Sequence, residues 1–145
     1  RICEAGTYAP TGMGFQSPII LAVTNRQLRD RLSAMNARIM GRDADPFYGA
    51  PVVLVVLADK SRGTYLYDGS LVMANLMLAA HAEGLGSCWI HRAKEEFESE
   101  EGKAILKELG IEGDYEGIGH CILGYADGPV PEAKPRKADY VKWVE

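Results

Sequence analysis

The sequence predicts one globular domain that combines helices with a β-sheet. Its 145 residues match the length of a single ordinary domain. Hydrophobic residues make up 47% of the chain and charged residues 25%, values typical of a folded mixed protein. Residues 52–57 are all aliphatic and predict a strand buried on both faces. Residues 65–83 are apolar around nearly the whole circumference of a helix, which predicts a long buried helix.

The first half of the chain predicts two further helices and one further strand. Residues 2–8 resemble the end of a helix, and residues 7–17 contain proline, threonine and two glycines, which indicates an ordered loop. The apolar run at residues 19–23 predicts a central strand. Asn25 is a suitable N-cap for a surface helix with apolar residues at helical spacing up to Ile39.

The second half predicts a helix end, a buried strand, a helix and a last strand. Gly84 suits the position that ends the apolar helix, and residues 87–91 indicate a buried strand. Ser99 is placed to cap a helix that reaches Leu109 and ends at Gly110. Residues 115–125 predict the last long strand, and the tail from Gly128 is rich in proline and basic residues. An apolar helix needs cover on every side, so we expect a homodimer.

Charge and hydropathy exclude several classes of partner. A net charge of −4 gives no broad positive field for a phosphate backbone, so we expect no nucleic acid. Residues 51–58 and 71–80, the longest apolar stretches, fall well short of the ~20 residues that span a bilayer, so we expect no membrane partner. Three cysteines without a spaced framework suggest reduced thiols and a cytoplasmic protein. Because Arg1 stands inside a helical pattern, we also expect residues upstream of it.

The segment after the apolar helix suggests a flavin site. Gly84 and Gly86 flank Leu85, and glycines let a main chain approach the polar edge of a flat ring without a Cβ collision. Cys88, Trp89 and Ile90 follow in the predicted strand, where Cys88 is expected to be a buried spacer. A second glycine-containing loop at residues 9–18 would complete the site.

Other patterns support alternative sites less well. Cys88, His91, His120 and Cys121 could be zinc ligands, but adjacent strand residues face opposite ways, so we expect no metal. Cys88 could be a nucleophile paired with a histidine, although a thiol in an apolar strand is usually inert. The glycine pairs lack the third glycine and the strand-to-helix context of a dinucleotide fingerprint.

A cluster of glutamates at residues 95–101 could be a binding patch or a pair of catalytic carboxylates. Lys94 and Lys103 are interspersed with these glutamates. We therefore expect a solvated helix face there.

Four motifs in a fixed order carry a resemblance to a known family. They are an Ala-Pro-Thr-Gly-x-x-x-Gln loop from Ala9, a strand led by Ala-Pro, an Asp-Gly helix running into Gly-Leu-Gly-Ser-Cys-Trp, and Leu-Gly-Tyr before a basic tail. Their order resembles that of the nitroreductase family of FMN-dependent oxidoreductases, over about residues 2–143. The resemblance implies an α+β fold with three layers, a mostly antiparallel sheet flanked by helices, and a homodimer with two FMN sites across its interface.

The resemblance also implies roles for individual residues. One subunit would place residues of the first loop near the flavin, and the other would place the glycine segment along the ring. Lys134 and Arg136 would neutralise the FMN phosphate, since a guanidinium matches phosphate oxygens in pairs. The expected FMN-binding residues are Pro10, Thr11, Gly12, Gln16, Gly84, Leu85, Gly86, Cys88, Trp89, Ile90, Lys134 and Arg136.

The sequence departs from the family pattern at two places. Gly14 stands where the family usually has asparagine, so one side-chain hydrogen bond of the loop is expected to be absent or replaced by the backbone. The Arg-x-Ser-x-Arg segment that normally opens these proteins and grips the phosphate is not in the sequence, and we expect truncation rather than natural loss.

The activity that the resemblance implies is an FMN-dependent, NAD(P)H-using nitroreductase reaction. Reducing equivalents would pass from NAD(P)H through tightly bound FMN to a nitroaromatic, quinone or similar small-molecule acceptor, in ping-pong order. No acid or base side chain is required, so we name no catalytic residue. Phe47, Tyr48 and Phe15 are candidates for stacking on the substrate, with ordinary packing as the alternative. The alternative function is a dimeric protein that binds or remodels flavin without reducing a separate substrate.

Overall fold

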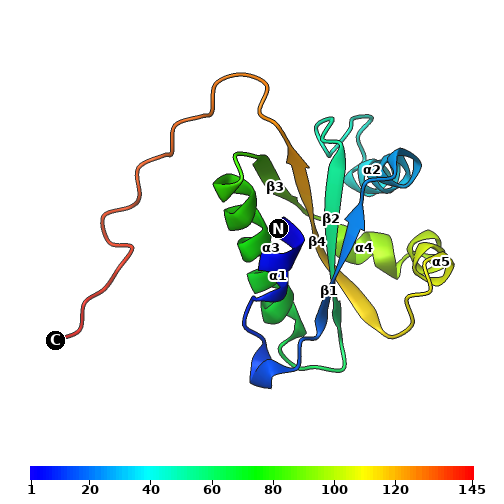
Figure 1. Ribbon diagram of the computed structural model, residues 1–145, viewed down its shortest axis with the longest axis horizontal. Helices are drawn as coiled ribbons and strands as arrows, with labels where there is room; N and C mark the ends of the chain where they lie inside the picture. Colours follow the sequence, from blue (N-terminus) through cyan, green and yellow to red (C-terminus); the bar gives the residue numbers. More distant parts are fainter.

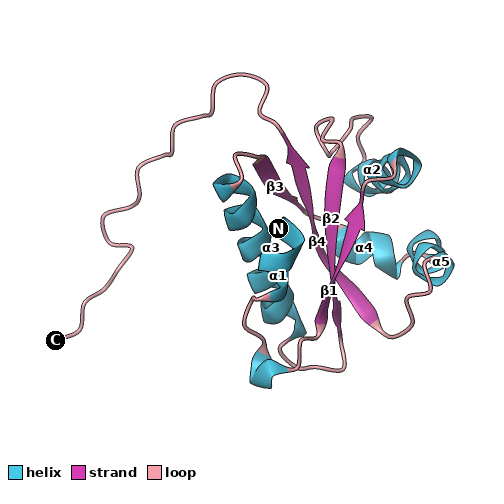
Figure 2. Cartoon of the chain, viewed as in Figure 1, coloured by secondary structure: helices cyan, strands magenta, loops and turns pink.

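The chain forms three layers, with a sheet between two groups of helices (Figure 1). The computed structural model describes all residues from Arg1 to Glu145. Helices α1 and α3 cover one face of the sheet, and helices α2, α4 and α5 lie on the other face (Figure 2).

The helices are α1 (Ile2–Thr7), α2 (Arg26–Met40), α3 (Tyr65–Ala82), α4 (Ala93–Glu98) and α5 (Glu100–Glu108), with a short 3-10 turn η1 (Gly12–Gly14). The strands are β1 (Pro18–Val23), β2 (Val52–Asp59), β3 (Gly86–Ile90) and β4 (Tyr115–Gly124). The three-layer α+β prediction is confirmed.

The sheet has the strand order β1-β2-β4-β3, and every neighbouring pair is antiparallel. Strand β2 is central and buried on both faces, as its unbroken aliphatic run predicts. Strand β4 pairs with β2 through an irregular register at Val56 and Leu57, next to β4 residues Gly117 and Gly119. The sheet formed by one chain is therefore wholly antiparallel.

Two strand predictions were wrong in position, although both strands exist. Residues 19–23 were expected in a central strand and residues 87–91 in a buried one, but β1 and β3 are the two edges of the sheet. Helices can cover the faces of an edge strand as they cover those of a central one. An apolar run therefore does not reveal whether a strand has one neighbouring strand or two. The consequence is that β3 has one free main-chain edge.

Each face of the sheet packs its own core. On the α2, α4 and α5 face, Leu32, Phe47, Val55 and Ile105 are almost completely buried. On the α1 and α3 face, Leu54, Met73, Leu76 and Cys121 are buried against one another. The alternation of β2 residues between the two cores follows from the period of a strand.

The predicted helix signals are confirmed at three termini. The Asn25 side chain accepts a hydrogen bond from the main-chain N–H of Leu28, and Ser99 caps α5 through the N–H of Gly102. Gly84 follows α3 with φ +76°, and the next residue, Leu85, donates to the carbonyl of Ala80 at 2.8 Å. This hydrogen bond fixes the direction in which the chain leaves α3 for β3.

The glutamate cluster is not a simple solvated face, which corrects the sequence prediction. Residues 93–98 form the short helix α4, and its Glu96 is completely buried. The charge pattern could not reveal this, because Glu96 faces the sheet while Glu95 and Glu98 on the same helix are exposed. Glu101, on the neighbouring helix, binds Arg31 and Arg38 of α2.

Helix α3 keeps part of its apolar circumference uncovered within one chain. Leu66, Tyr67, Leu71 and Leu78 are all exposed there, and the tail after β4 extends away from the body (Figure 1). The tail itself exposes Val141, Trp143 and Val144. A second copy as cover for this surface remains a prediction. No helix is long and apolar enough to cross a membrane.

Candidate functional site

The glycine segment leads into the free edge of the sheet. Gly86 is the first residue of β3 and pairs with Gly124 of β4. Cys88 is exposed, so the prediction that it is a buried spacer was wrong. Ile90, two residues further along the same strand, is buried, so the exposure is local to this part of β3. The indole Nε1 of Trp89 is buried without a hydrogen-bond partner in the chain.

The free edge of β3 offers the type of group that the polar edge of a flavin needs. An edge strand presents a row of main-chain N–H and C=O groups that no other strand satisfies. The isoalloxazine ring carries both acceptors and a donor along its polar edge, so such a row can bind it without any particular side chain. The donor set at residues 86–90 therefore fits the predicted flavin better than it fits a metal, which would require ligating side chains.

The first predicted loop is held by a carboxylate that the sequence analysis did not select as a site residue. Asp68, in the first turn of α3, is 3% exposed. Its Oδ1 accepts from the N–H of Gly12 at 3.0 Å, and its Oδ2 accepts from the hydroxyls of Ser17 at 3.1 Å and Thr64 at 3.0 Å. An acidic residue at the start of an otherwise apolar helix was the available signal.

The same loop has a backbone that few residues tolerate. Met13, Gly14 and Gln16 all have φ between +51° and +71°. Gly14 occupies a left-handed position at φ +71°, where glycine and asparagine are both favoured. The Gln16 N–H also donates to the Thr11 hydroxyl at 3.0 Å. The loop is thus fixed by Asp68 and Thr11 despite its strained residues.

One chain does not bring the two predicted flavin segments together. The first loop touches the beginning of α3 through Asp68, whereas Gly84 and Gly86 follow the end of the same helix. An α3 of 18 residues is about 27 Å long. Thr11 and Gln16 instead line a pocket of about 370 Å³ between α1, the loop and β1.

The two aromatic residues proposed to contact substrate differ in their surroundings. Phe47 is completely buried in the core and lies 5.1 Å from the His120 ring, so its prediction as a stacking residue was wrong. Tyr48 is 80% exposed and lines a pocket of about 560 Å³ together with Gly86, Cys88 and Tyr125. Two adjacent aromatic residues in a sequence do not show which ring is buried, because neighbouring side chains in a turn point to opposite sides.

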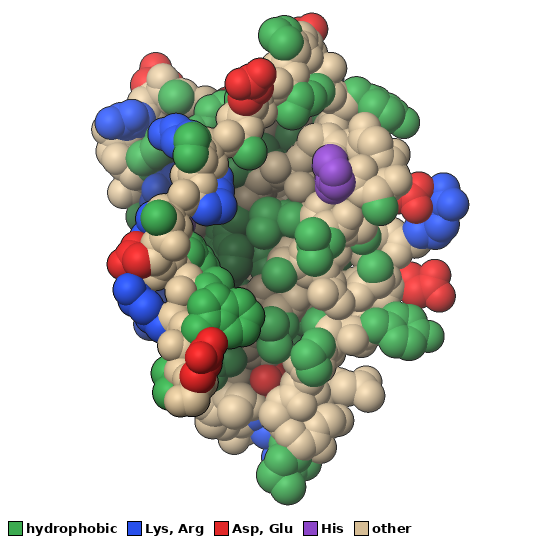
Figure 3. Space-filling view, turned by 90° about the vertical axis from the view of Figure 1, so that its left-hand side faces the viewer, with side chains coloured by type: hydrophobic (Ala, Val, Ile, Leu, Met, Phe, Trp, Pro, Cys, Tyr) green, Lys and Arg blue, Asp and Glu red, His purple; other side chains and the backbone are tan.

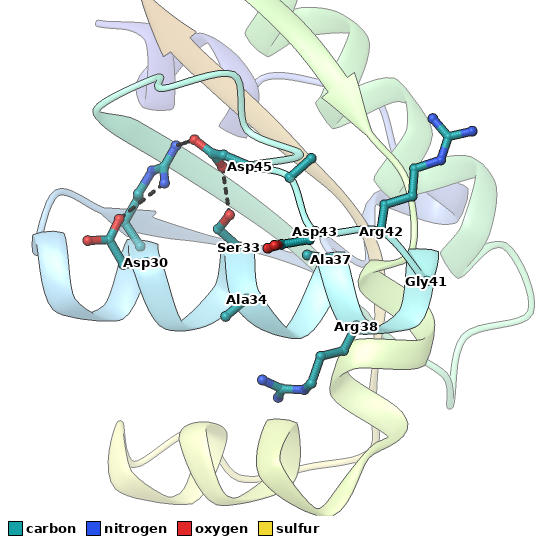
Figure 4. A pocket seen from close by; sticks show the side chains of 11 residues that line it. Asp30, Ser33, Ala34, Ala37, Arg38, Gly41, Arg42, Asp43 and Asp45 are labelled. Atoms are coloured by element: carbon teal, nitrogen blue, oxygen red, sulfur yellow. Dashed lines mark hydrogen bonds and ion pairs between the residues drawn. The ribbon is translucent and has the colours of Figure 1, made fainter.

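The turn that carries Tyr48 is fixed by Asp45, whose contact with Ser33 is drawn in Figure 4. Ser33 donates to the Asp45 carboxylate at 2.6 Å and Arg29 at 2.5 Å, and the N–H groups of Phe47 and Gly49 donate to it as well. Burial acts to raise the Asp45 pKa, but these four donors outweigh burial and hold the pKa well below its usual 3.8. Tyr48, at φ +52°, is therefore presented by a rigid turn.

Acid is expected to weaken the Asp45 turn in a defined pH range. A carboxylate whose pKa is lowered by folding stabilises the fold fully above its unfolded pKa, near 3.8, and this contribution is lost as pH falls toward the folded value. The difference in unfolding free energy between wild type and Asp45→Asn should thus be constant from pH 5 to 7 and shrink below pH 4. Urea unfolding at each pH measures it, and a difference that grows with acid would contradict the assignment.

The two basic residues predicted to bind phosphate lie in the tail. Arg136 donates through its Nε and a terminal nitrogen to the main-chain oxygen of Lys134, and both residues are exposed. The side from which the tail extends also carries a hollow in which hydrophobic side chains gather (Figure 3). The contact of Lys134 and Arg136 with a phosphate remains a prediction.

The four residues considered for zinc do not converge. His120 faces Glu96 and Phe47, whereas Cys121 belongs to the core on the opposite face of the sheet. Burial raises the pKa of the Cys121 thiol to about 12, so this cysteine is held as an inert thiol. No group of three or more histidine, cysteine, aspartate or glutamate side chains is placed to hold a metal ion.

Comparisons with known proteins identify related chains. Residues 1–125 match the model of the nitroreductase family. A curated protein of Methanothermobacter thermautotrophicus, with the provisional name NADH dehydrogenase/NAD(P)H nitroreductase, is 28% identical over 94 residues. That alignment covers 61% of this chain but only 46% of the relative, so the chain matches about half of the relative's length.

Solved structures resemble the whole chain. A nitroreductase with bound FMN from Bacteroides fragilis superimposes with a TM-score of 0.85 at 30% identity, covering 99% of this chain and 84% of that one. A nitroreductase with bound FMN from Desulfitobacterium hafniense gives a TM-score of 0.85 at 28% identity, with the same coverage. With its three-layer fold, its glycine segment and its match over residues 1–125, the chain belongs to the nitroreductase family.

Proposed function

We propose that this protein is an FMN-dependent oxidoreductase that transfers reducing equivalents from NAD(P)H to a nitroaromatic, quinone or similar small acceptor. The observation that carries the proposal is the free main-chain edge of β3, which begins at Gly86 and directly follows Gly84 and Leu85. Structural relatives of the family contain FMN, and the curated relative carries a nicotinamide-dependent name. FMN would supply the hydride chemistry when bound.

The active unit in this proposal is a homodimer. The loop with Pro10, Thr11, Gly12 and Gln16 lies beside the start of α3, and the glycine segment lies beyond its end. Two copies related by a two-fold axis could bring the loop of one chain to the β3 edge of the other. The exposed apolar residues of α3 would then be covered by the second copy.

Main-chain groups would bind the flavin ring, and side chains would bind the phosphate and the acceptor. Main-chain groups of Gly84–Gly86 and Cys88–Ile90 would orient the ring and stabilise negative charge on it by fixed N–H donors. Lys134 and Arg136 would reach the phosphate from the tail. Tyr48 would stack on the acceptor, because it is exposed, aromatic and held by a rigid turn.

Phe15 offers a second aromatic surface beside the first loop. Its ring is 49% exposed and is covered by the Arg62 guanidinium at 4.2 Å from the ring centre. We expect this pair to border the ring or the nicotinamide. Because Cys3, Cys88 and Cys121 are free thiols, we also propose a reducing, cytoplasmic setting.

The visible spectrum of the purified full-length protein tests the proposal. We expect a yellow protein that NADH or NADPH bleaches and that a nitroarene or quinone recolours, with ping-pong kinetics. The oligomeric state should be a dimer by light scattering. A variant such as Arg136→Ala should lose affinity for FMN but not for riboflavin, because only FMN carries the phosphate.

Two other outcomes would point away from a reductase. A yellow protein that no nicotinamide reduces would support the alternative function of binding or remodelling flavin. A colourless protein that takes up no added FMN would overturn both functions.

A further inference from the structure

A cluster of polar side chains is buried behind the end of β3. Asn36 of α2, Glu96 of α4 and His120 of β4 all have 0% exposure. The Asn36 amide donates to Glu96 Oε2 at 2.9 Å, and His120 Nε2 lies 2.9 Å from the same oxygen. Three elements far apart in sequence thus meet at one carboxylate oxygen.

The cluster is attached to the turn that joins β3 to α4. The Asn36 amide also donates to the main-chain oxygen of His91 at 2.8 Å, and His120 Nδ1 lies 3.4 Å from the oxygen of Ile90. The Arg92 Nε in turn donates to Asn36 Oδ1 at 2.8 Å. Each of the three successive residues 90–92 therefore contacts the cluster.

The turn itself has a conformation that its sequence does not favour. Arg92 has φ +76°, in the left-handed region that suits glycine and strains other residues. Such a conformation persists only where the surroundings fix it. Asn36 supplies that restraint from both sides, since its amide holds His91 and its oxygen holds Arg92.

Stability alone does not explain the cluster. The ring nitrogens of His120 lie near oxygen atoms of Glu96 and Ile90, but Nε2 makes no hydrogen bond of good geometry. Glu96 Oε1 is buried with no partner. Burying a charged or polar group whose hydrogen bonds are incomplete usually contributes no more stability than apolar residues of the same volume, so the arrangement is better suited to fixing a geometry.

We propose that Asn36, Glu96 and His120 are positioning residues for the flavin site. By holding the Ile90–Arg92 turn, they would fix the direction of the main-chain groups at the C-terminal end of β3. This inference rests on the proposed function, because it requires FMN to lie along that strand. Fixed N–H donors favour the more negative, reduced state of a flavin, so loosening the turn should lower its midpoint potential.

The test compares Glu96→Gln with a matched core variant in the dimeric holoprotein. Glu96→Gln keeps the size of the side chain but removes its charge. Leu106→Ala removes packing from the core on the same face, in helix α5, and Leu106 takes part in none of the hydrogen bonds of the cluster. Both should lower the unfolding temperature. Only Glu96→Gln should change the ratio of affinities for oxidised and reduced FMN, by about tenfold, which is about 30 mV for a two-electron couple.

A second substitution checks that the effect passes through the turn. Arg92→Gly removes the cost of the left-handed conformation together with the Arg92 hydrogen bond to Asn36, so the turn depends less on the cluster. The change in potential caused by Glu96→Gln should therefore be smaller in the Arg92→Gly background than in the wild type. Equal changes in both backgrounds would contradict action through the turn.

The other possible results separate a failure of the positioning role from a failure of the proposed function. If Glu96→Gln and Leu106→Ala leave the potential equal to that of the wild type, the positioning role is wrong while the proposed function stands. If Glu96→Gln does not fold, Asn36→Ala is measured in the same way. Failure of both to fold, while Leu106→Ala folds, would make the cluster a folding determinant and overturn the proposal. A wild-type protein that binds no FMN would overturn the proposed function itself.

Discussion

Replacing Asp68 with alanine is expected to reduce FMN affinity at least tenfold and to lower the unfolding free energy by about 3 kcal/mol. The carboxylate is 3% exposed and accepts from Gly12, Ser17 and Thr64. Without it, three donors lose their acceptor, and the Gly12 N–H has no other partner in the loop. Flavin titration followed by fluorescence quenching measures the affinity, and urea unfolding measures the stability.

Asp68→Asn and Ser17→Ala are the matched controls for this prediction. Asparagine keeps the oxygen for Gly12, and the two hydroxyls can rotate to accept from its amide, so a partial loss is expected. Ser17→Ala removes one of the three hydrogen bonds and should have the smallest effect. Wild-type FMN affinity in Asp68→Ala would mean that the loop does not contact the flavin.

Much of the fold could be predicted because its elements carry local signals. The aliphatic run of β2, the Asn25 and Ser99 caps and the glycine after α3 all act within a few residues of themselves. The edge position of β1 and β3 carries no such signal, since it depends on which strands pair across the chain. The burial of Glu96 in helix α4 was missed because a charged residue that folds inward carries no local signal.

The sequence predicted the main-chain part of the candidate site, and its contact with a flavin stays a prediction. Glycines at positions 84 and 86 indicated close approach to a ring, and they do lead into a free strand edge. The residues that hold the site were harder to find, because Asp68, Asn36 and His120 act through contacts 30 to 60 positions away in sequence. A polar residue inside an apolar pattern is the one signal that all three share.

Replacing Phe47 with alanine should lower the unfolding free energy by roughly 3–5 kcal/mol. Phe47 is completely buried, lies against His120 and sits under the Arg29 guanidinium, so alanine leaves a cavity in the core. The same change should leave the KM for nitroaromatic and quinone acceptors unchanged in whatever fraction of the protein remains folded. Phe47→Leu, which keeps most of the volume, should recover most of the stability.

Tyr48→Ala should show the opposite pattern to Phe47→Ala, because Tyr48 is 80% exposed and does not pack in the core. Its unfolding free energy should change by less than about 0.5 kcal/mol. The loss of an aromatic face beside Cys88 should raise the KM for aromatic acceptors several-fold, and Tyr48→Phe should restore it, since stacking needs the ring and not the hydroxyl. Steady-state kinetics with a nitroarene and with a non-aromatic acceptor separate the two effects. An equal rise in KM for both acceptors would show that Tyr48 shapes the site without stacking on the substrate.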